Sequence, residues 1–120
     1  MIVGLGTDIL PIARIERILA RNPRALPEFV LSKKELISYN QLPKHKQANF
    51  IAKRVAAKEA LAKAYGTGIR DLSFWKEHTI ENDSLGKPVI STVQSYICHL
   101  SISDTSEYVT ATVILEDIKA

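Results

Sequence analysis

The sequence predicts an α+β fold, a single domain over residues 1–120 with an N-terminal strand, early helices and a later antiparallel sheet. Apolar residues recur with the helical period between residues 11 and 65, whereas after Gly68 short β-rich segments alternate with turn residues. The chain has 120 residues, of which 46% are hydrophobic and 24% charged, and this size and balance suit one hydrophobic core.

The first two elements are a predicted short buried strand over residues 2–10 and a predicted helix over residues 11–22. Pro11 is favourable in the first turn of a helix, where its missing N–H costs nothing. Pro23 cannot continue the helix, so we expect the helix to end before it.

Two further helices are predicted. Ser32 followed by Glu35 is a capping-box pattern, which opens a short helix through about residue 39. A long helix rich in alanine is predicted over residues 46–65, because alanine favours helix and Gly66 is the usual residue after a helix end.

The second half of the chain is predicted to be β-structure. We expect four strands, at residues 73–81, 87–93, 100–103 and 108–116. The last two should form a hairpin closed by residues 104–107. In the final strand every second residue is apolar, which predicts a face toward the core made of Val109, Ala111, Val113 and Leu115.

The composition excludes several classes of protein. A formal net charge of +3 is too small to indicate nucleic acid by itself, and aromatic residues are not interleaved with basic ones. No segment approaches the ~20 apolar residues of a membrane span, and no export signal is present. A single cysteine, Cys98, forms neither an internal disulfide nor a metal cluster. We therefore expect a cytoplasmic protein that binds neither nucleic acid nor membrane.

Asp8 is an anomaly because it follows an apolar strand and two glycines, where the chain should turn near the core. A carboxylate in such a place needs a hydrogen bond, an ion pair or a metal ion. We interpret Asp8 either as a capping or turn-forming residue or as a metal ligand, and the pattern alone leaves both open.

The long helix carries charge on its apolar side. Arg54 and Lys58 fall within the apolar arc, where two cations are unfavourable unless an anion meets them. Alternatively, their long stems extend past the edge of the helix into solvent. Glu59 and Lys63 lie one turn apart near the edge of the arc and form either a surface ion pair or part of a site.

Two weaker signals follow. Gly66-Thr67-Gly68 is either a helix stop or a phosphate-binding loop, and its place after a helix C-terminus favours the stop. His99 precedes an alternating polar face that contains Ser101 and Ser103. That face is either solvated or lines a binding site.

Several motifs, in this order, resemble those of the holo-[acyl-carrier-protein] synthases, the short bacterial group of phosphopantetheinyl transferases. The resemblance covers essentially the whole chain. Its segments are Gly4-Leu5-Gly6-Thr7-Asp8-Ile9, Leu31-Ser32 with Glu35, Ala52-Lys53-Arg54-Val55-Ala56-Ala57-Lys58-Glu59-Ala60 with Lys63, Gly66-Thr67-Gly68-Ile69, Gly86-Lys87-Pro88 and His99-Leu100-Ser101-Ile102-Ser103. It implies transfer of 4′-phosphopantetheine from coenzyme A to a serine of apo-acyl carrier protein, with release of adenosine 3′,5′-bisphosphate, in support of fatty acid biosynthesis.

The resemblance also implies a catalytic centre made of Asp8, Glu59 and Lys63. Asp8 and Glu59 would ligate Mg²⁺, which suits one or two carboxylates completed by water and phosphate oxygens. Lys63 would stabilise the charge that builds on the pyrophosphate. Removal of the serine proton stays open between Glu59 and a water molecule that a carboxylate orients.

By the same resemblance, coenzyme A would contact a second set of residues, namely Arg54, Lys58, Lys63, Gly86, Lys87, Pro88 and His99. Arg54 and Lys58 would thereby meet the anion that their positions require. The chain departs from the family at Asp104, where many relatives have histidine, so a role of this position in phosphate binding is in doubt.

The implied partner is acyl carrier protein, which is small and acidic and which the family docks on its first helix. Four arginines on or near the first predicted helix offer a complementary surface: Arg14, Arg17, Arg21 and Arg24. A solvated helix face is the alternative. The resemblance also implies a homotrimer with active sites between subunits.

Two rival classes are a basic module that binds nucleic acid and a subunit that binds acyl carrier protein without catalysis. The first would need aromatic stacking residues among the basic ones. The second would not need Asp8, Glu59 and Lys63 together.

Overall fold

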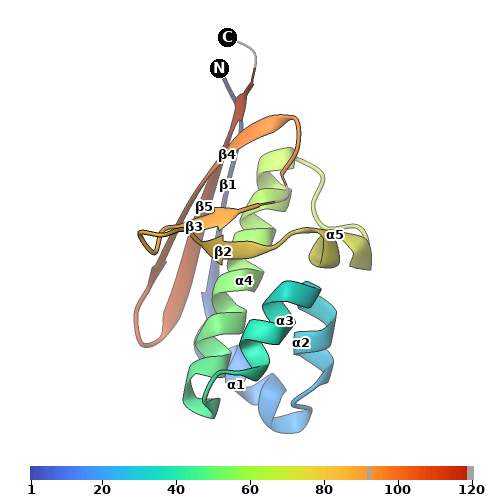
Figure 1. Cartoon of the computed structure of the whole chain (residues 1–120), viewed down its shortest axis with the longest axis vertical. Helices are drawn as coiled ribbons and strands as arrows, with labels where there is room; N and C mark the ends of the chain where they lie inside the picture. Colours follow the sequence, from blue (N-terminus) through green and yellow to red (C-terminus); the bar gives the residue numbers. More distant parts are fainter. Residues whose placement is uncertain (92, 119–120) are drawn as a thin grey trace.

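Helix α4 (Lys44–Tyr65) runs through the middle of the molecule, between a three-stranded sheet and a group of short helices (Figure 1). The computed structural model describes residues 1–91 and 93–118. The remaining elements are β1 (Ile2–Pro11), α1 (Ile12–Arg21), α2 (Ala25–Val30), α3 (Lys33–Asn40), α5 (Leu72–Glu77), β2 (Ile80–Asn82), β3 (Pro88–Ile90), β4 (Tyr96–Asp104) and β5 (Tyr108–Asp117). No helix in the described part of the chain combines the length and the apolar character that crossing a membrane requires.

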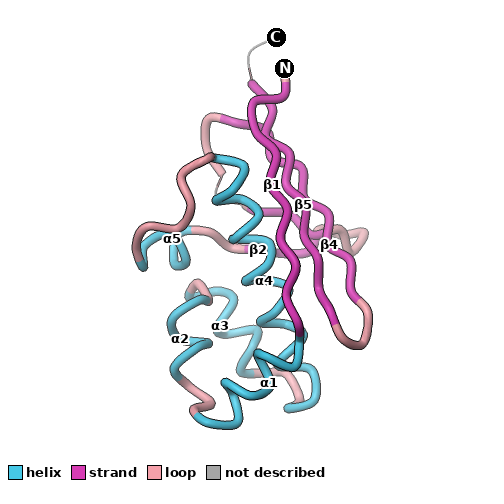
Figure 2. The backbone as a smooth tube through the Cα atoms, turned by 180° about the vertical axis from the view of Figure 1, so that it is seen from behind, coloured by secondary structure: helices cyan, strands magenta, loops and turns pink. Residues whose placement is uncertain are grey.

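The three-stranded sheet has the order β1-β5-β4, with antiparallel neighbours, and β2 and β3 form a separate two-stranded hairpin. Seen from behind in Figure 2, β1, β5 and β4 lie side by side, with α4 against β1 and β5. Because side chains alternate along a strand, one face of this sheet packs on α4 and the other face points away from it.

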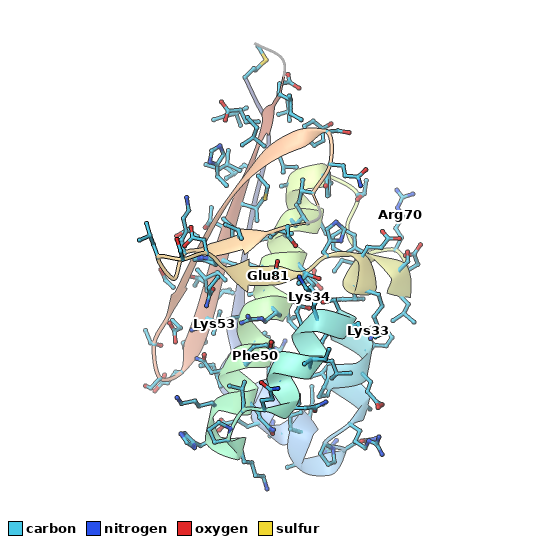
Figure 3. All side chains as sticks on the ribbon, viewed as in Figure 1. Lys33, Lys34, Phe50, Lys53, Arg70 and Glu81 are labelled. Carbon is cyan, nitrogen blue, oxygen red and sulfur yellow. The ribbon has the colours of Figure 1, made fainter. Side chains whose placement is uncertain are left out.

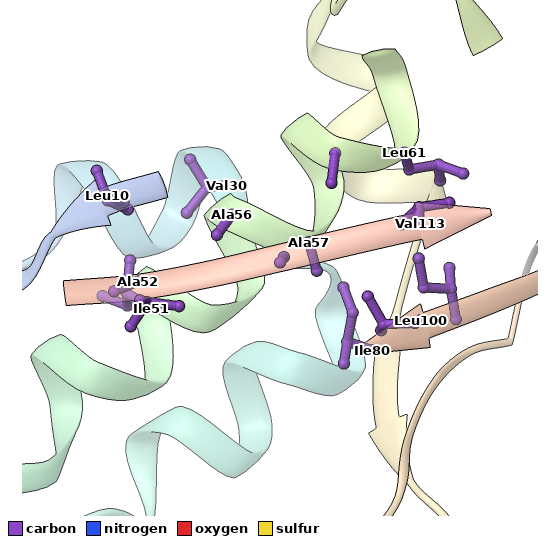
Figure 4. Packing of buried hydrophobic residues seen from close by; sticks show 14 of the residues in the cluster. Leu10, Val30, Ile51, Ala52, Ala56, Ala57, Leu61, Ile80, Leu100 and Val113 are labelled. Carbon is purple, nitrogen blue, oxygen red and sulfur yellow. The ribbon is translucent and has the colours of Figure 1, made fainter. Parts of the chain in front are cut away.

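The alternating pattern predicted for the last strand is confirmed. Val109, Ala111, Val113 and Leu115 of β5 are at most 1% exposed. They join a core to which β1, α4, β4 and the shorter elements also contribute, and Figure 4 shows it extending along β5 from Leu10 at one end to Leu100 and Val113 at the other.

The strand predicted at the N-terminus is also confirmed, although its outer residues are exposed rather than buried. Gly4 and Gly6 do not interrupt it. They let β1 approach α4, because an added Cβ would lie 2.1 Å from the Ala64 carbonyl oxygen at Gly4 and 1.9 Å from the Ala60 carbonyl oxygen at Gly6. The glycines therefore set the distance between β1 and α4.

Three predicted helices are found with small changes at their ends. In the capping box of α3, the Glu35 backbone N–H donates to Ser32 Oγ at 3.3 Å, and the Ser32 backbone N–H donates to Glu35 Oε1 at 2.8 Å. Helix α4 begins two residues earlier than predicted, at Lys44, and ends at Tyr65, followed by the cap residue Gly66, whose φ is +81°.

Other predictions for the fold were wrong. The strand predicted over residues 73–81 is mostly helix α5, because Asp71 caps it by accepting a hydrogen bond from the Phe74 backbone N–H at 3.3 Å; only β2 is strand. The strand predicted over 87–93 is limited to β3, and Thr92 lies outside the described residues. Helix α2 was not predicted, and β4 begins four residues earlier than expected.

Candidate active site

Asp8 of β1 and Lys63 of α4 meet where the strand crosses the helix. The Lys63 ammonium donates to the Thr7 carbonyl oxygen at 3.0 Å, and its Nζ lies 3.3 Å from Asp8 Oδ1. Asp8 does not cap the following helix, since the residue at the cap position of α1 is Pro11, which has no side-chain bond there. Nor does Asp8 turn the chain, because β1 continues through it to Pro11. The interpretation of Asp8 as a metal ligand stays a prediction.

Glu59 of α4 belongs to the same cluster as Asp8 and Lys63. We call its two carboxylates, Asp8 and Glu59, the acidic pair. Burial raises the pKa of Glu59, the negative charge of Asp8 raises it further, and Lys63 acts in the opposite direction. Within residues 1–91 and 93–118, Glu59 has neither a hydrogen bond nor an ion pair through its carboxylate. Two carboxylates that repel each other are the arrangement that a bound cation stabilises.

The acidic pair fits Mg²⁺ in the number and type of its ligands. The described residues contain no group of three or more His, Cys, Asp or Glu side chains able to hold a metal ion. Mg²⁺ is nevertheless held in many phosphate sites by one or two carboxylates, with water and substrate oxygens as the other ligands. Asp8 and Glu59 are the residues that would hold it here.

A second group of candidate residues surrounds a cavity of about 200 Å³ beside the β2–β3 hairpin, which we call the hairpin pocket. Its lining consists of Lys53, Arg54, Ile80, Asn82, Gly86, Pro88 and Ile102. Lys87, although on the same hairpin, is exposed and is not part of this lining.

Arg54 is the main cation of the hairpin pocket. Its side chain is 13% exposed, and the guanidinium carbon lies 3.7 Å from the centre of the Phe50 ring. Nη2 donates to the Ile80 carbonyl oxygen at 3.5 Å, while the buried Nε has no hydrogen-bond partner in the described chain. Since a guanidinium has five N–H donors, Arg54 keeps donors for a ligand.

Lys58 is a correction to the predicted site. Its side chain is completely buried, and its ammonium donates to Glu35 Oε1 at 2.6 Å, to the Val30 carbonyl oxygen at 2.9 Å and to the Trp75 carbonyl oxygen at 2.8 Å. All three donors of the ammonium are thus used inside the protein. The anion that the helix pattern required is Glu35, and not a phosphate.

His99 lies apart from both groups. It is on the face of β4 that points away from α4, half exposed, with Nε2 2.9 Å from Glu116 Oε1 of β5. Asp104 accepts a hydrogen bond from Asn49 at 3.0 Å and has an oxygen 3.9 Å from Lys53 Nζ. Its carboxylate therefore reduces the positive charge beside the hairpin pocket.

The acidic pair and the hairpin pocket lie on different sides of α4. Arg54 and Glu59 are five residues apart, which places them about 140° apart around a helix. Asp8 is on the edge strand β1, whereas Ile102 of the pocket is on the opposite edge strand β4. Within one chain the acidic pair and the hairpin pocket are therefore separate.

The arginines predicted to bind a partner are exposed. Arg14, Arg17 and Arg21 of α1 surround a shallow hollow of about 130 Å³ that Ile18 also lines, and Ile18 is 38% exposed. Arg24 pairs with Glu28 at 3.7 Å. Sequence reasoning missed Ile18, whose only signal is an isoleucine between arginines that share a helical face.

Known proteins resemble this chain over nearly its full length. The family model of the 4′-phosphopantetheinyl transferase superfamily matches residues 4–113. Holo-[acyl-carrier-protein] synthases of Vibrio parahaemolyticus and Vibrio vulnificus are 44% and 45% identical, and each comparison covers 96% of this chain and 98% of the relative.

Solved structures agree with these relatives. A holo-(acyl-carrier-protein) synthase from Bacillus anthracis, in complex with CoA (3′,5′-ADP), superimposes with a TM-score of 0.88 at 39% identity over 98% of both chains. The holo-[acyl-carrier-protein] synthase of Neisseria meningitidis gives a TM-score of 0.86 at 39% identity, over 98% of this chain and 100% of that one.

Proposed function

The chain belongs to the 4′-phosphopantetheinyl transferase superfamily, and from this membership we infer that it is a holo-[acyl-carrier-protein] synthase. It transfers 4′-phosphopantetheine from coenzyme A to a serine of apo-acyl carrier protein and releases adenosine 3′,5′-bisphosphate. The transfer supports fatty acid biosynthesis. We assign the activity to one phosphopantetheinyl transferase domain and to the cytoplasm.

The observation that carries this function is the meeting of Asp8, Glu59 and Lys63 at one point. The two carboxylates would hold Mg²⁺, which supplies neutralisation of the pyrophosphate charge when bound. The Lys63 ammonium, half exposed beside Asp8, stabilises the negative charge that develops as the bond to the leaving adenosine 3′,5′-bisphosphate breaks. The serine hydroxyl loses its proton to Glu59 or to a water molecule that a carboxylate orients.

Coenzyme A binding in the presence and absence of Mg²⁺ separates this function from a non-catalytic subunit. If the chain is a transferase, calorimetry should detect binding of coenzyme A. Mg²⁺ should strengthen this binding, because the acidic pair would otherwise repel the pyrophosphate. A chain that binds acyl carrier protein but no coenzyme A would be the non-catalytic subunit.

We assign docking of the acidic acyl carrier protein to the arginine face of α1. Arg14, Arg17 and Arg21 are exposed and have no acidic partner among the described residues, so their charge is available to a partner. Ile18 between them adds an apolar contact at the centre of this face. Basic rims around an apolar contact are favourable for binding an acidic surface.

Reversing Arg14 and Arg21 to Glu should raise KM for acyl carrier protein and leave coenzyme A binding unchanged. KM should also rise with salt for the unaltered chain, because exposed charges are screened beyond about 8–10 Å. Steady-state kinetics over a salt series measures both. Reversing Lys33 of α3 and Arg70 of the loop between α4 and α5, both exposed, is the matched control and should leave KM unchanged (Figure 3). A salt-independent KM would remove docking from this face.

We further propose a homotrimer whose active sites lie between subunits. Coenzyme A would have to reach both the acidic pair and the hairpin pocket, which lie on different sides of α4 in one chain. The face of the sheet that points away from α4 exposes apolar side chains, among them Leu5 at 66% and Ile9 at 63%. A second copy that covers this face would bury them and bring the two halves together.

Complementation between inactive chains tests the shared site. Asp8→Ala and His99→Ala should each be impaired alone, since one removes a carboxylate of the acidic pair and the other a proposed coenzyme A contact. If these residues act from different subunits, mixed trimers should regain activity that neither parent has. Full activity of a stable monomer at micromolar concentration, measured by sedimentation, would contradict the trimer.

A further inference from the structure

Glu35 is a buried carboxylate that accepts several hydrogen bonds. It belongs neither to the acidic pair nor to the lining of the hairpin pocket, so the proposed function does not yet account for its burial. Its side chain is 1% exposed. Oε1 accepts from the Ser32 backbone N–H and from Lys58, and Oε2 accepts from the Ile80 backbone N–H at 2.8 Å. One carboxylate thus ties α3 and α4 to the first residue of β2.

The backbone carbonyl of Ile80 is also bound, by Arg54. Its carbonyl oxygen accepts from Arg54 Nη2, and the Arg54 Nε lies 4.0 Å from Glu35 Oε2. Both backbone groups of this residue are therefore used, the N–H by Glu35 and the carbonyl by Arg54. The β2–β3 hairpin, which continues from Ile80 to Gly86 and Pro88, begins at this double contact.

A capping box alone would need only the bond between Glu35 and Ser32. Lys58, which donates a hydrogen bond to Glu35, donates its two other hydrogen bonds to the Val30 and Trp75 carbonyl oxygens. Its ammonium therefore keeps no donor for a ligand. A buried ion pair contributes little net stability compared with apolar residues of the same volume. What the carboxylate adds is a defined place for the hairpin and for Arg54.

We propose that Glu35 is a positioning residue for coenzyme A: it sets the hairpin and Arg54 against each other, so that the hairpin pocket has the shape that binds the nucleotide end of coenzyme A. This inference rests on the proposed function. Glu35 does not touch the substrate; it acts through Ile80 and Arg54, which line the pocket.

The test is the double variant Glu35→Gln with Lys58→Met, which removes both charges of the Glu35–Lys58 ion pair together, so that the buried Lys58 ammonium is not left without its anion. The Ser32 and Ile80 N–H groups bond different oxygens of Glu35, and Gln replaces one of these oxygens by an NH₂ donor, so one of the two N–H groups loses its acceptor. KM for coenzyme A should rise between about 10- and 100-fold, the scale of an ångström of misplacement, while KM for acyl carrier protein stays unchanged. A role limited to stability would not separate the two constants.

Two further variants make the result specific. Glu35→Asp keeps a negative charge opposite Lys58, but its shorter side chain no longer reaches the Ile80 N–H. If the double variant does not fold, the KM of Glu35→Asp for coenzyme A tests the positioning role instead. Lys34→Ala breaks the exposed pair with Glu81 at 3.1 Å, which also joins α3 to β2 (Figure 3), and should leave KM for coenzyme A unchanged.

An unchanged KM for coenzyme A in folded Glu35→Asp and double-variant chains would overturn the positioning role, and so would an equal rise of both KM values. These outcomes leave the proposed function intact, because the unaltered chain is measured beside them. If the unaltered chain binds no coenzyme A by calorimetry, the proposed function fails, and the inference fails with it.

Discussion

Asp8→Ala and Glu59→Ala should each slow transfer of 4′-phosphopantetheine by about 100-fold or more. Each variant removes one carboxylate of the acidic pair, and loss of a single strong electrostatic stabiliser has effects of this size. Neither side chain supports the core, and the two carboxylates repel each other, so the fold should survive both changes. Initial rates at saturating coenzyme A and millimolar Mg²⁺ measure the effect.

The matched control is Glu77→Ala, which removes an exposed carboxylate at the end of α5, outside both the acidic pair and the hairpin pocket, and should leave the rate unchanged. Unfolding curves should show the same midpoint for all three variants within a few degrees. Near-normal activity of Asp8→Ala or Glu59→Ala, in an enzyme that a chelator still inhibits, would mean that other residues hold the metal.

Gly6→Ala should lower both stability and activity. The new Cβ would lie 1.9 Å from the Ala60 carbonyl oxygen and 2.7 Å from the Ala64 backbone nitrogen, so β1 must move away from α4. Forcing an extra carbon into a packed contact costs about 3 kcal/mol, which corresponds to roughly 10 °C in Tm for a chain of this size. Asp8, two residues on, moves with the strand, so activity should fall below the level that the lost stability explains.

Gly68→Ala is the control for this prediction. Gly68 has a φ of +67° and open space around it, so its alanine variant carries only backbone strain, about 1 kcal/mol. Gly6→Ala should have a clearly lower Tm than Gly68→Ala in thermal unfolding. It should also have a clearly lower transfer rate when both variants are assayed at a temperature below their Tm. Equal Tm values for the two variants would show that the contact of β1 with α4 tolerates a side chain at Gly6.

Local patterns predicted the elements whose signals lie within a few residues. The capping box at Ser32, the glycine after α4 and the alternation along β5 are such signals, and all three are found. The strand predicted at residues 73–81 failed because Asp71 caps a short helix there, in which Trp75 is buried, and strand propensity depends strongly on context. Helix α2 was missed because it is six residues long and contains Pro27.

The site was predictable only in part. The residues showed that Lys58 needs an anion, but the choice between a bound phosphate and Glu35, 23 positions away, depends on how α3 packs on α4. Likewise, the pattern gave no way to know that Asp8 and His99 face opposite sides of one sheet, since that requires the strand register. The resemblance to the family assigned Asp8 and His99 to one active site. That the two residues lie apart within one chain is seen only in the folded structure.

The most direct test of the proposed transfer is the mass of apo-acyl carrier protein after incubation with this chain, coenzyme A and Mg²⁺. We predict a gain of one phosphopantetheine group, roughly 340 Da, located on a single serine, together with release of adenosine 3′,5′-bisphosphate. The Asp8→Ala chain should give little of this product in the same time. An unchanged carrier-protein mass with the folded, unaltered chain would contradict the assignment as a holo-[acyl-carrier-protein] synthase.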